Sequence, residues 1–339
     1  MSTLQTVWFI LFTVLIAGYA VLDGFDLGVG VLHGFAKNDD ERRRHLNAVG
    51  PVWDGNEVWL LTAGGALFAA FPIVYATVFS GFYLALMLVV AALVFRATSF
   101  EFRGKVDTPR WRSFWDWSFV LGSLVASLLF GVAVGNIARG IPIDADGRFV
   151  GSFLGLLNPF ALLVGLVTLS AFVMHGAAYL LLKVEGDHRD RMRRWVRGSW
   201  LTFVGLYAAA NGWALAALPH GFDGIATNPL IWLFGAALIV SIVTVPLAAQ
   251  RQRDGLTFLG SAGTILAMIA LPAIGLFPRL VPSSIDLAYS LTAYNASSSQ
   301  RTLTVMLYIA LIGMPLVLVY TAYVYRVFKG KVVLTEESY

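Results

Sequence analysis

The sequence predicts an all-α integral membrane protein with nine transmembrane helices. Hydrophobic residues make up 58% of the 339 positions and charged residues only 13%, which is about half the charged fraction of a soluble domain. A helix needs about 20 mostly apolar residues to cross a bilayer, and nine stretches of suitable length and composition follow one another along the chain. They cover residues 7–35, 50–71, 76–97, 114–137, 153–182, 200–218, 229–249, 256–277 and 303–325.

The distribution of positive charge predicts how these spans are oriented. Of the 24 Lys and Arg residues, only Arg139, Arg148, Arg279 and Arg301 lie in connections of one kind, and all the others lie in the alternate connections or the C-terminal tail. Basic residues are retained on the cytoplasmic side during insertion. This alternation requires an odd number of spans, so we expect the N-terminus outside and the C-terminus in the cytoplasm of a bacterial cell, with the chain in the cytoplasmic membrane.

The chain reads as a single polytopic membrane domain. Its loops alternate in a way that suggests a pseudo-repeat of two four-helix bundles, residues 7–137 and 153–277, followed by a ninth helix at 303–325. The connection 279–301 is rich in proline, serine and tyrosine, and we expect it to be an ordered cap over the outer face.

Composition excludes several classes of function. The chain has no cysteine, which rules out disulfides, thiolate metal sites, iron–sulfur clusters and covalently attached c-type haem. The net charge of +4 comes from short loops, not from a basic stripe of the kind that binds nucleic acid. We therefore expect no nucleic-acid partner, and membrane lipid as the surroundings.

Five carboxylates fall within the predicted spans. A charged side chain at the centre of a bilayer costs about 2.5–3.5 kcal/mol on insertion scales, so each needs a partner, a water-filled cavity or a proton. With the predicted orientation, all five lie in the cytoplasmic half of the membrane, which is where a proton route from the cytoplasm would begin. They are Asp23, Asp26, Asp54, Glu57 and Asp116.

The spacing of these acids supports a common environment. Asp23 and Asp26 are three residues apart, as are Asp54 and Glu57, so each pair projects from one helix face. Asn56 and the indoles of Trp53 and Trp59 would supply hydrogen-bonding groups beside the second pair.

A structural interpretation stays open for each acid. Asp116 falls in the first turn of its predicted span, where an acid favours the helix dipole. Glu57 could pair with a basic loop residue or form a hydrogen bond across helices.

Two segments resemble the signature segments of cytochrome bd ubiquinol oxidase subunit II, the haem-free second subunit of bd-type quinol oxidases. They read LDGFDLG, at residues 22–28, and WDGNEVWL, at residues 53–60. The resemblance implies a complex that oxidises quinol and reduces oxygen to water, with two b-type haems and one d-type haem in a partner, subunit I. It also implies a heterodimer, often with a very small single-helix subunit. Within this chain it implies that Asp54 contributes to the cytoplasmic proton route.

The residues available for binding haem agree with that resemblance. Only His175 among the five histidines lies well inside a predicted span, and a lone helical histidine is usually a hydrogen-bonded structural residue. We therefore expect no haem ligand and no metal site in this chain.

Two alternatives remain at this stage. Carboxylates within the membrane also drive proton-coupled secondary transporters, although those sites usually lie near the midplane, between broken helices. The acids could instead belong to a purely structural anchor, in which they bind a cation or basic loops.

Overall fold

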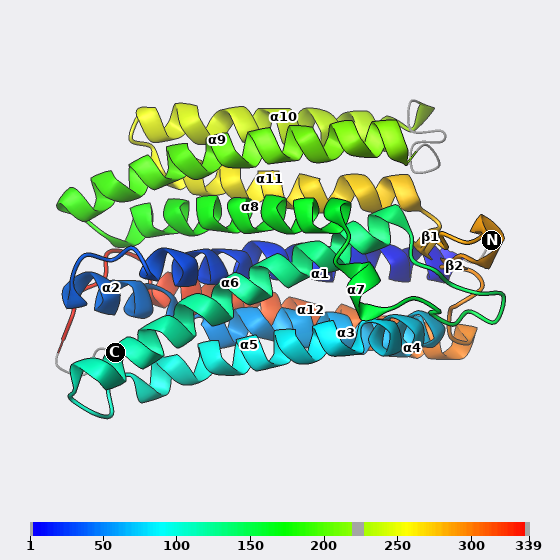
Figure 1. The fold of residues 1–339 in the computed structure, drawn as a ribbon, viewed down its shortest axis with the longest axis horizontal. Coiled ribbons are helices and arrows are strands. Elements are labelled where there is room, and N and C mark those ends of the chain that lie inside the picture. Colours follow the sequence, from blue (N-terminus) through cyan, green and yellow to red (C-terminus); the bar gives the residue numbers. More distant parts are fainter. Residues whose placement is uncertain (1–2, 219–226, 336–339) are drawn as a thin grey trace.

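The chain forms long, roughly parallel helices that are stacked in layers (Figure 1). The computed structural model describes residues 3–218 and 227–335. The described elements, in chain order, are α1 (Thr3–His33), α2 (Asp39–Val49), α3 (Trp53–Ala70), α4 (Pro72–Gly81), α5 (Tyr83–Phe102), α6 (Pro109–Arg139), α7 (Phe153–Leu156), α8 (Pro159–Lys183), α9 (Gly186–Ala217), α10 (Pro229–Gln250), α11 (Asp254–Leu276), β1 (Arg279–Val281), the 3₁₀ turn η3 (Leu287–Tyr289), β2 (Leu291–Thr292) and α12 (Gln300–Val327).

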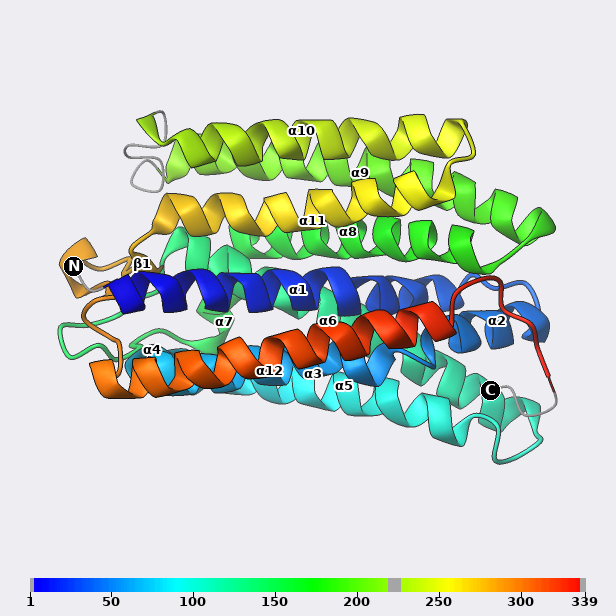
Figure 2. The ribbon, with the colours of Figure 1, turned by 180° about the vertical axis from the view of Figure 1, so that it is seen from behind.

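Seven of the described helices are long and apolar enough to cross a membrane. They are α1, α5, α6, α8, α10, α11 and α12. The other two predicted spans correspond to α3, whose first turns carry Asp54, Asn56 and Glu57, and to α9, whose first turns are strongly charged. Both helices run alongside the seven (Figures 1 and 2).

Helix α1 lies in the middle of the layers. It packs against α3, α6, α8 and α11, and α12 lies along the same side of the molecule as α3 (Figure 2). Glycines make the central contact possible. A Cβ on Gly28 would lie 1.8 Å from the carbonyl oxygen of Phe172 in α8, and a Cβ on Gly176 would meet the backbone of Gly28 in return. The two helices therefore meet backbone to backbone, as small residues in membrane helices allow.

The two ends of the helical body differ in charge. One end, here called the basic end, contains α2, the α5–α6 connection, the start of α9 and the tail after α12 (Figure 1). The opposite end contains α4, β1 and β2, and α1 begins there. The connection 279–301 was expected to be ordered, and this is confirmed: β1 and β2 pair antiparallel, and Ser284 N donates to Ile141 O at 2.9 Å.

Several helix boundaries differ from the prediction. The basic segment after the first span is not a loop: Asn38 caps α2 by accepting from Glu41 N at 2.9 Å, and the acids of its first turn suit the helix dipole. The predicted span 76–97 starts too early, since α4 is a separate short helix and α5 begins at Tyr83. The predicted span 153–182 is interrupted because Asn158 caps a new helix, α8, with its side chain accepting from Ala161 N.

Candidate functional site

A buried ion pair joins α1 to α5. The Arg96 guanidinium donates from Nη2 to Asp23 Oδ1 at 2.6 Å and from Nη1 to Asp23 Oδ2 at 3.1 Å, and both side chains are fully buried. The Tyr19 hydroxyl donates to Asp23 Oδ2 at 2.8 Å. Arg96 lies at the end of the predicted span 76–97, and its grouping with the basic connection that follows was wrong: the residue lies within α5, where it supplies the counter-charge that Asp23 needs.

The second acid of α1 belongs to the same cluster. Asp26 Oδ2 lies 3.9 Å from Arg96 Nη2 and accepts a hydrogen bond from Asn56 Nδ2 at 2.7 Å. Asn56 Oδ1 in turn accepts from the Tyr325 hydroxyl of α12 at 2.9 Å. The other oxygen, Asp26 Oδ1, is buried and has no hydrogen-bond partner among residues 3–218 and 227–335. The cluster therefore contains one acceptor that is free to take a proton or a water molecule.

The acids of α3 connect this cluster to the surface. Glu57 Oε2 lies 3.7 Å from Arg96 Nη1, and the Glu57 side chain is 20% exposed. Asp54, one turn earlier, is exposed. Three carboxylates thus face the single Arg96 guanidinium: Asp23, Asp26 and Glu57. With all of them ionised the group would have a net charge of −2, so a proton on one or two carboxylates would relieve the imbalance.

Asp116 lies in a different network, at the basic end. Its Oδ1 accepts from Arg103 Nε at 2.5 Å and lies 2.8 Å from His33 Nε2, and its Oδ2 lies 3.7 Å from Arg42 Nε. The expected position in the first turn is wrong, because α6 begins at Pro109 and Thr108 caps it. Asp116 is therefore held in place by cations rather than by the helix dipole.

The two tryptophans beside the α3 acids pack against other groups. The Trp53 ring stacks on Phe100 with centroids 5.1 Å apart and an angle of 4°. Trp59 is buried and packs against Gly18, where an added Cβ would lie 2.4 Å from its ring. These contacts orient α3 against α1 and α5.

A histidine cluster at the basic end was not singled out from the sequence. His45 Nε2 and His188 Nε2 lie 3.0 Å apart, and the His33 and His45 rings are 5.9 Å apart. A hydrogen bond between two Nε2 atoms needs one donor and one acceptor, so at least one ring is neutral. Burial, together with the nearby His33, His188 and Arg191, holds the pKa of His45 well below its usual value.

His175, the histidine that lies well inside a predicted span, is hydrogen-bonded within the chain. His175 is fully buried. Its Nδ1 lies 2.7 Å from Ser261 Oγ and its Nε2 lies 2.9 Å from Val21 O. Both ring nitrogens thus bind groups of this chain.

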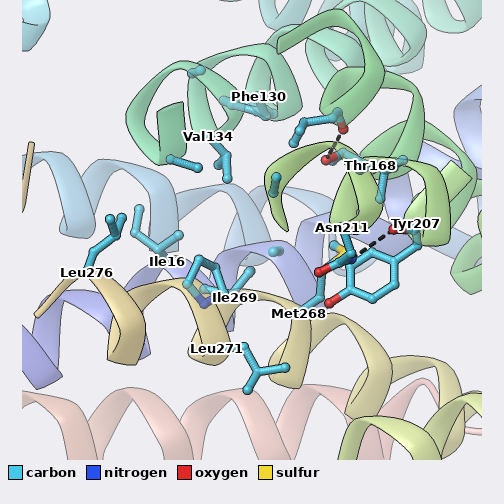
Figure 3. Close-up of a pocket in the computed structure, with 18 of the residues that line it drawn as sticks. Ile16, Phe130, Val134, Thr168, Tyr207, Asn211, Met268, Ile269, Leu271 and Leu276 are labelled. Atoms are coloured by element: carbon cyan, nitrogen blue, oxygen red, sulfur yellow. Dashed lines mark hydrogen bonds between the residues drawn. The ribbon is translucent and has the colours of Figure 1, made fainter. Parts of the chain in front are cut away.

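An apolar cavity of about 470 Å³ is lined by residues of α1, α3, α6, α8, α9, α10 and α11. Figure 3 shows Ile16, Phe130 and Met268 among its lining residues, together with the polar side chains of Thr168, Tyr207 and Asn211. Asn211 Nδ2 donates to Tyr207 O at 2.8 Å, and Thr168 Oγ1 donates to Val164 O at 3.0 Å. The walls are therefore suited to an apolar occupant.

Comparisons with known proteins agree with the two signature segments. Residues 4–328 match the family model for cytochrome bd terminal oxidase subunit II. Cytochrome bd-I ubiquinol oxidase subunit 2 of Escherichia coli is 38% identical, over 98% of this chain and 96% of that one. Cytochrome bd ubiquinol oxidase subunit 2 of Bacillus subtilis is 40% identical, over 98% of each chain. A chain of the bd oxidase structure from Geobacillus thermodenitrificans has the same fold, with a TM-score of 0.78 at 17% identity, over 96% of this chain and 99% of that one.

Removing the cation of the buried pair should destabilise the protein strongly. We expect Arg96→Leu to lower the free energy of unfolding by about 3–5 kcal/mol, because breaking one side of a buried pair leaves uncompensated charge. Arg96→Lys should rescue only part of this loss, since an ammonium does not match the bidentate geometry. Thermal unfolding of the purified protein in detergent measures both.

Arg148 provides a matched control, since it is 77% exposed and lies 3.8 Å from Asp146. We expect Arg148→Leu to change stability by less than about 1 kcal/mol. Equal effects of the two leucine substitutions would contradict the assigned role of Arg96.

The histidine cluster should make stability depend on pH. Because the folded pKa of His45 is lowered, the unfolded state binds more protons near pH 6, and stability falls as pH drops through the ordinary histidine pKa of about 6.5. His45→Gln removes this titration, so the decrease in melting temperature between about pH 7.5 and pH 5.5 should be smaller in the variant. Identical pH profiles for the two proteins would refute the assignment.

Proposed function

Because the chain belongs to the cytochrome bd terminal oxidase subunit II family, we propose that it acts as the second subunit of a membrane complex that oxidises quinol and reduces oxygen to water. Its role in this proposal has two parts: it supports a haem-bearing subunit I, and it supplies part of the route by which protons reach that subunit. The protein is a multi-pass membrane protein, and the proposed location is the bacterial cytoplasmic membrane.

The observation that carries the proton role is the line of acids from the surface of α3 to the buried guanidinium. Asp54 is exposed, Glu57 is partly exposed and lies 3.7 Å from Arg96 Nη1, and Asp26 lies beyond them, linked to α3 by Asn56. The excess of carboxylate over guanidinium at this point favours groups that gain and lose protons.

The residues have different parts in this proposal. Asp54 and Glu57 exchange protons with water at the surface of the subunit, and Asp26 is the inner acceptor, with Asn56 holding one of its oxygens. Asp23 is held by both arms of Arg96, and Asp116 is held by Arg103 and His33. These two acids act as fixed anions that shape the electric field along the route. Trp53 and Trp59 support α3 by packing.

We propose the topology of nine spans with the N-terminus outside and the C-terminus in the cytoplasm. The start of α1 and the end of α12 at opposite ends of the molecule support it (Figure 1), as does the concentration of basic residues at one end. The pseudo-repeat would group α1, α3, α5 and α6 as one bundle and α8 to α11 as the other. The packing of α5 on α6, of α8 on α9 and of α10 on α11 supports this grouping, and the contacts of α1 and α6 with α8 join the two bundles.

The partner in this proposal is subunit I, in a heterodimer, with a very small single-helix subunit as a further component. Two b-type haems and one d-type haem belong to subunit I, and quinol is the substrate of the complex. The exposure of the Asp54 side chain supports the need for a partner subunit that covers it. Asp54 lies on the surface of α3 in this chain alone, and a carboxylate within the membrane needs a covering protein or water.

Neutralising the outer acids should slow turnover. In the assembled complex, we expect Asp54→Asn to lower oxygen consumption with a reduced quinol by about 100-fold or more, because a positioned proton-transfer group typically contributes about 10²-fold or more. Glu57→Gln should have a similar effect. The haem content, followed by the reduced-minus-oxidised optical spectrum, should stay unchanged.

Asp107→Asn is the matched control. Asp107 is 91% exposed at the same end and pairs with Arg112, outside the proposed route, and its neutralisation should leave turnover intact. Wild-type turnover in an Asp54→Asn, Glu57→Gln double variant with normal haem content would exclude these acids from the route.

A further inference from the structure

A groove of about 910 Å³ lies between α5 and α6. Its volume is within the range of about 300–1,000 Å³ that is usual for ligand sites. Its walls are mainly apolar and include Leu88 and Phe95 of α5 and Phe114 and Leu121 of α6. Phe95 and Phe114 are more than half exposed, so no part of residues 3–218 and 227–335 covers these two side chains.

The groove is longer than the hydrocarbon part of one membrane leaflet. On α6 it runs from Arg110 to Val125, which at a rise of about 1.5 Å per residue is about 22 Å. The hydrocarbon core of a bilayer is about 30 Å thick, so one leaflet contributes about 15 Å. The groove is therefore long enough for an acyl chain and the region just below its headgroup.

The polar groups of the groove gather toward one end. Arg110, Ser113 and Trp117 line it at intervals of three and four residues along the first turns of α6, so they lie on one face of the helix. Tryptophan is enriched where membranes meet water. This end of the groove is at the basic end of the molecule.

Arg110 is available to a ligand. It is exposed, and within residues 3–218 and 227–335 no carboxylate lies within ion-pairing distance of it. The nearby Asp107 is instead bound to Arg112, at 2.7 Å. An arginine in this position can bind a phosphate through two parallel hydrogen bonds.

From these observations we propose that the groove binds a phospholipid with an anionic headgroup. Its phosphate lies on Arg110, and one acyl chain lies along Leu88, Phe95 and Leu121. The charge at one end and the apolar walls along the rest match an amphiphile. This inference depends on the orientation proposed above, in which the basic end faces the cytoplasm, and it does not depend on the proton route.

The floor of the groove favours a lipid over another helix. A third helix usually packs closely where small residues leave the backbone open. Here Gly122 is already in contact with α5, because a Cβ at this position would lie 2.5 Å from Ala92 O. The groove is therefore shallow and lies over two helices that are already packed together, which suits a flexible acyl chain.

Native mass spectrometry of the purified complex tests the proposal. Phosphatidylglycerol or phosphatidylcholine is added in detergent, and the bound lipids are counted. We expect retention of phosphatidylglycerol in preference to phosphatidylcholine. Arg110→Gln should lower the affinity for phosphatidylglycerol about tenfold, as loss of one charge-assisted contact predicts. Arg197→Gln, which alters an exposed arginine on α9, is the control and should have no effect.

A second variant tests the apolar part of the site. Ala91 lines the groove and is exposed, so Ala91→Phe should fill the space without disturbing the core and should also lower lipid binding. Equal binding of the two lipids, or unchanged binding in Arg110→Gln, would overturn the proposal. A small polypeptide that is retained by the wild type and lost from Ala91→Phe would do the same. Because the readout is bound lipid, it is independent of oxygen consumption and of the acids of α3.

Discussion

One buried guanidinium constrains the arrangement of three helices. Arg96 of α5 binds Asp23 of α1 with both arms and lies within 4 Å of Asp26 and of Glu57 on α3. A charge in an apolar interior is very unfavourable alone and binds an opposite charge strongly. The positions of α1, α3 and α5 relative to one another are therefore fixed around this group. Since the arginine neutralises one acid fully, the remaining carboxylates are left for proton exchange.

Close packing of α1 completes this arrangement. Gly28 and Gly176 bring the α1 and α8 backbones together, and Asn56 links the cluster to Tyr325 of α12. The acids of α1, Asp23 and Asp26, are consequently buried. Among the acids near Arg96 in the described residues, those at least partly exposed to the surroundings are Asp54 and Glu57 of α3. In this geometry the α3 acids can exchange protons with the surroundings, whereas the α1 acids are buried beside Arg96.

Much of this could be predicted from the sequence, because it depends on local composition. The apolar stretches predicted the long helices. Arg96 was misplaced because it lies at the very end of a predicted apolar span and precedes other basic residues, so its charge grouped it with the connection that follows. Its partner lies 73 positions away, and a single sequence contains no signal for that contact.

The division of roles among the acids was also beyond the sequence. The spacing of three residues places Asp54 and Glu57 on one helix face, but only the packing of α3 decides that this face is exposed. Asp116 was predicted in a first turn because its helix was predicted to begin at residue 114, whereas Thr108 and Pro109 start α6 earlier. Helix α2 was missed because it is short and charged, and its stability depends on its cap and on burial of His45 and Leu46.

The most direct test of the central claim is the rate of proton uptake during a single turnover. The complex is reconstituted in vesicles with a pH-sensitive dye on the side of the basic end, and fully reduced enzyme is mixed with oxygen. If the α3 acids collect protons, uptake from that side slows in Glu57→Gln while the initial binding of oxygen keeps its rate. Proton uptake at the wild-type rate in that variant would contradict the account.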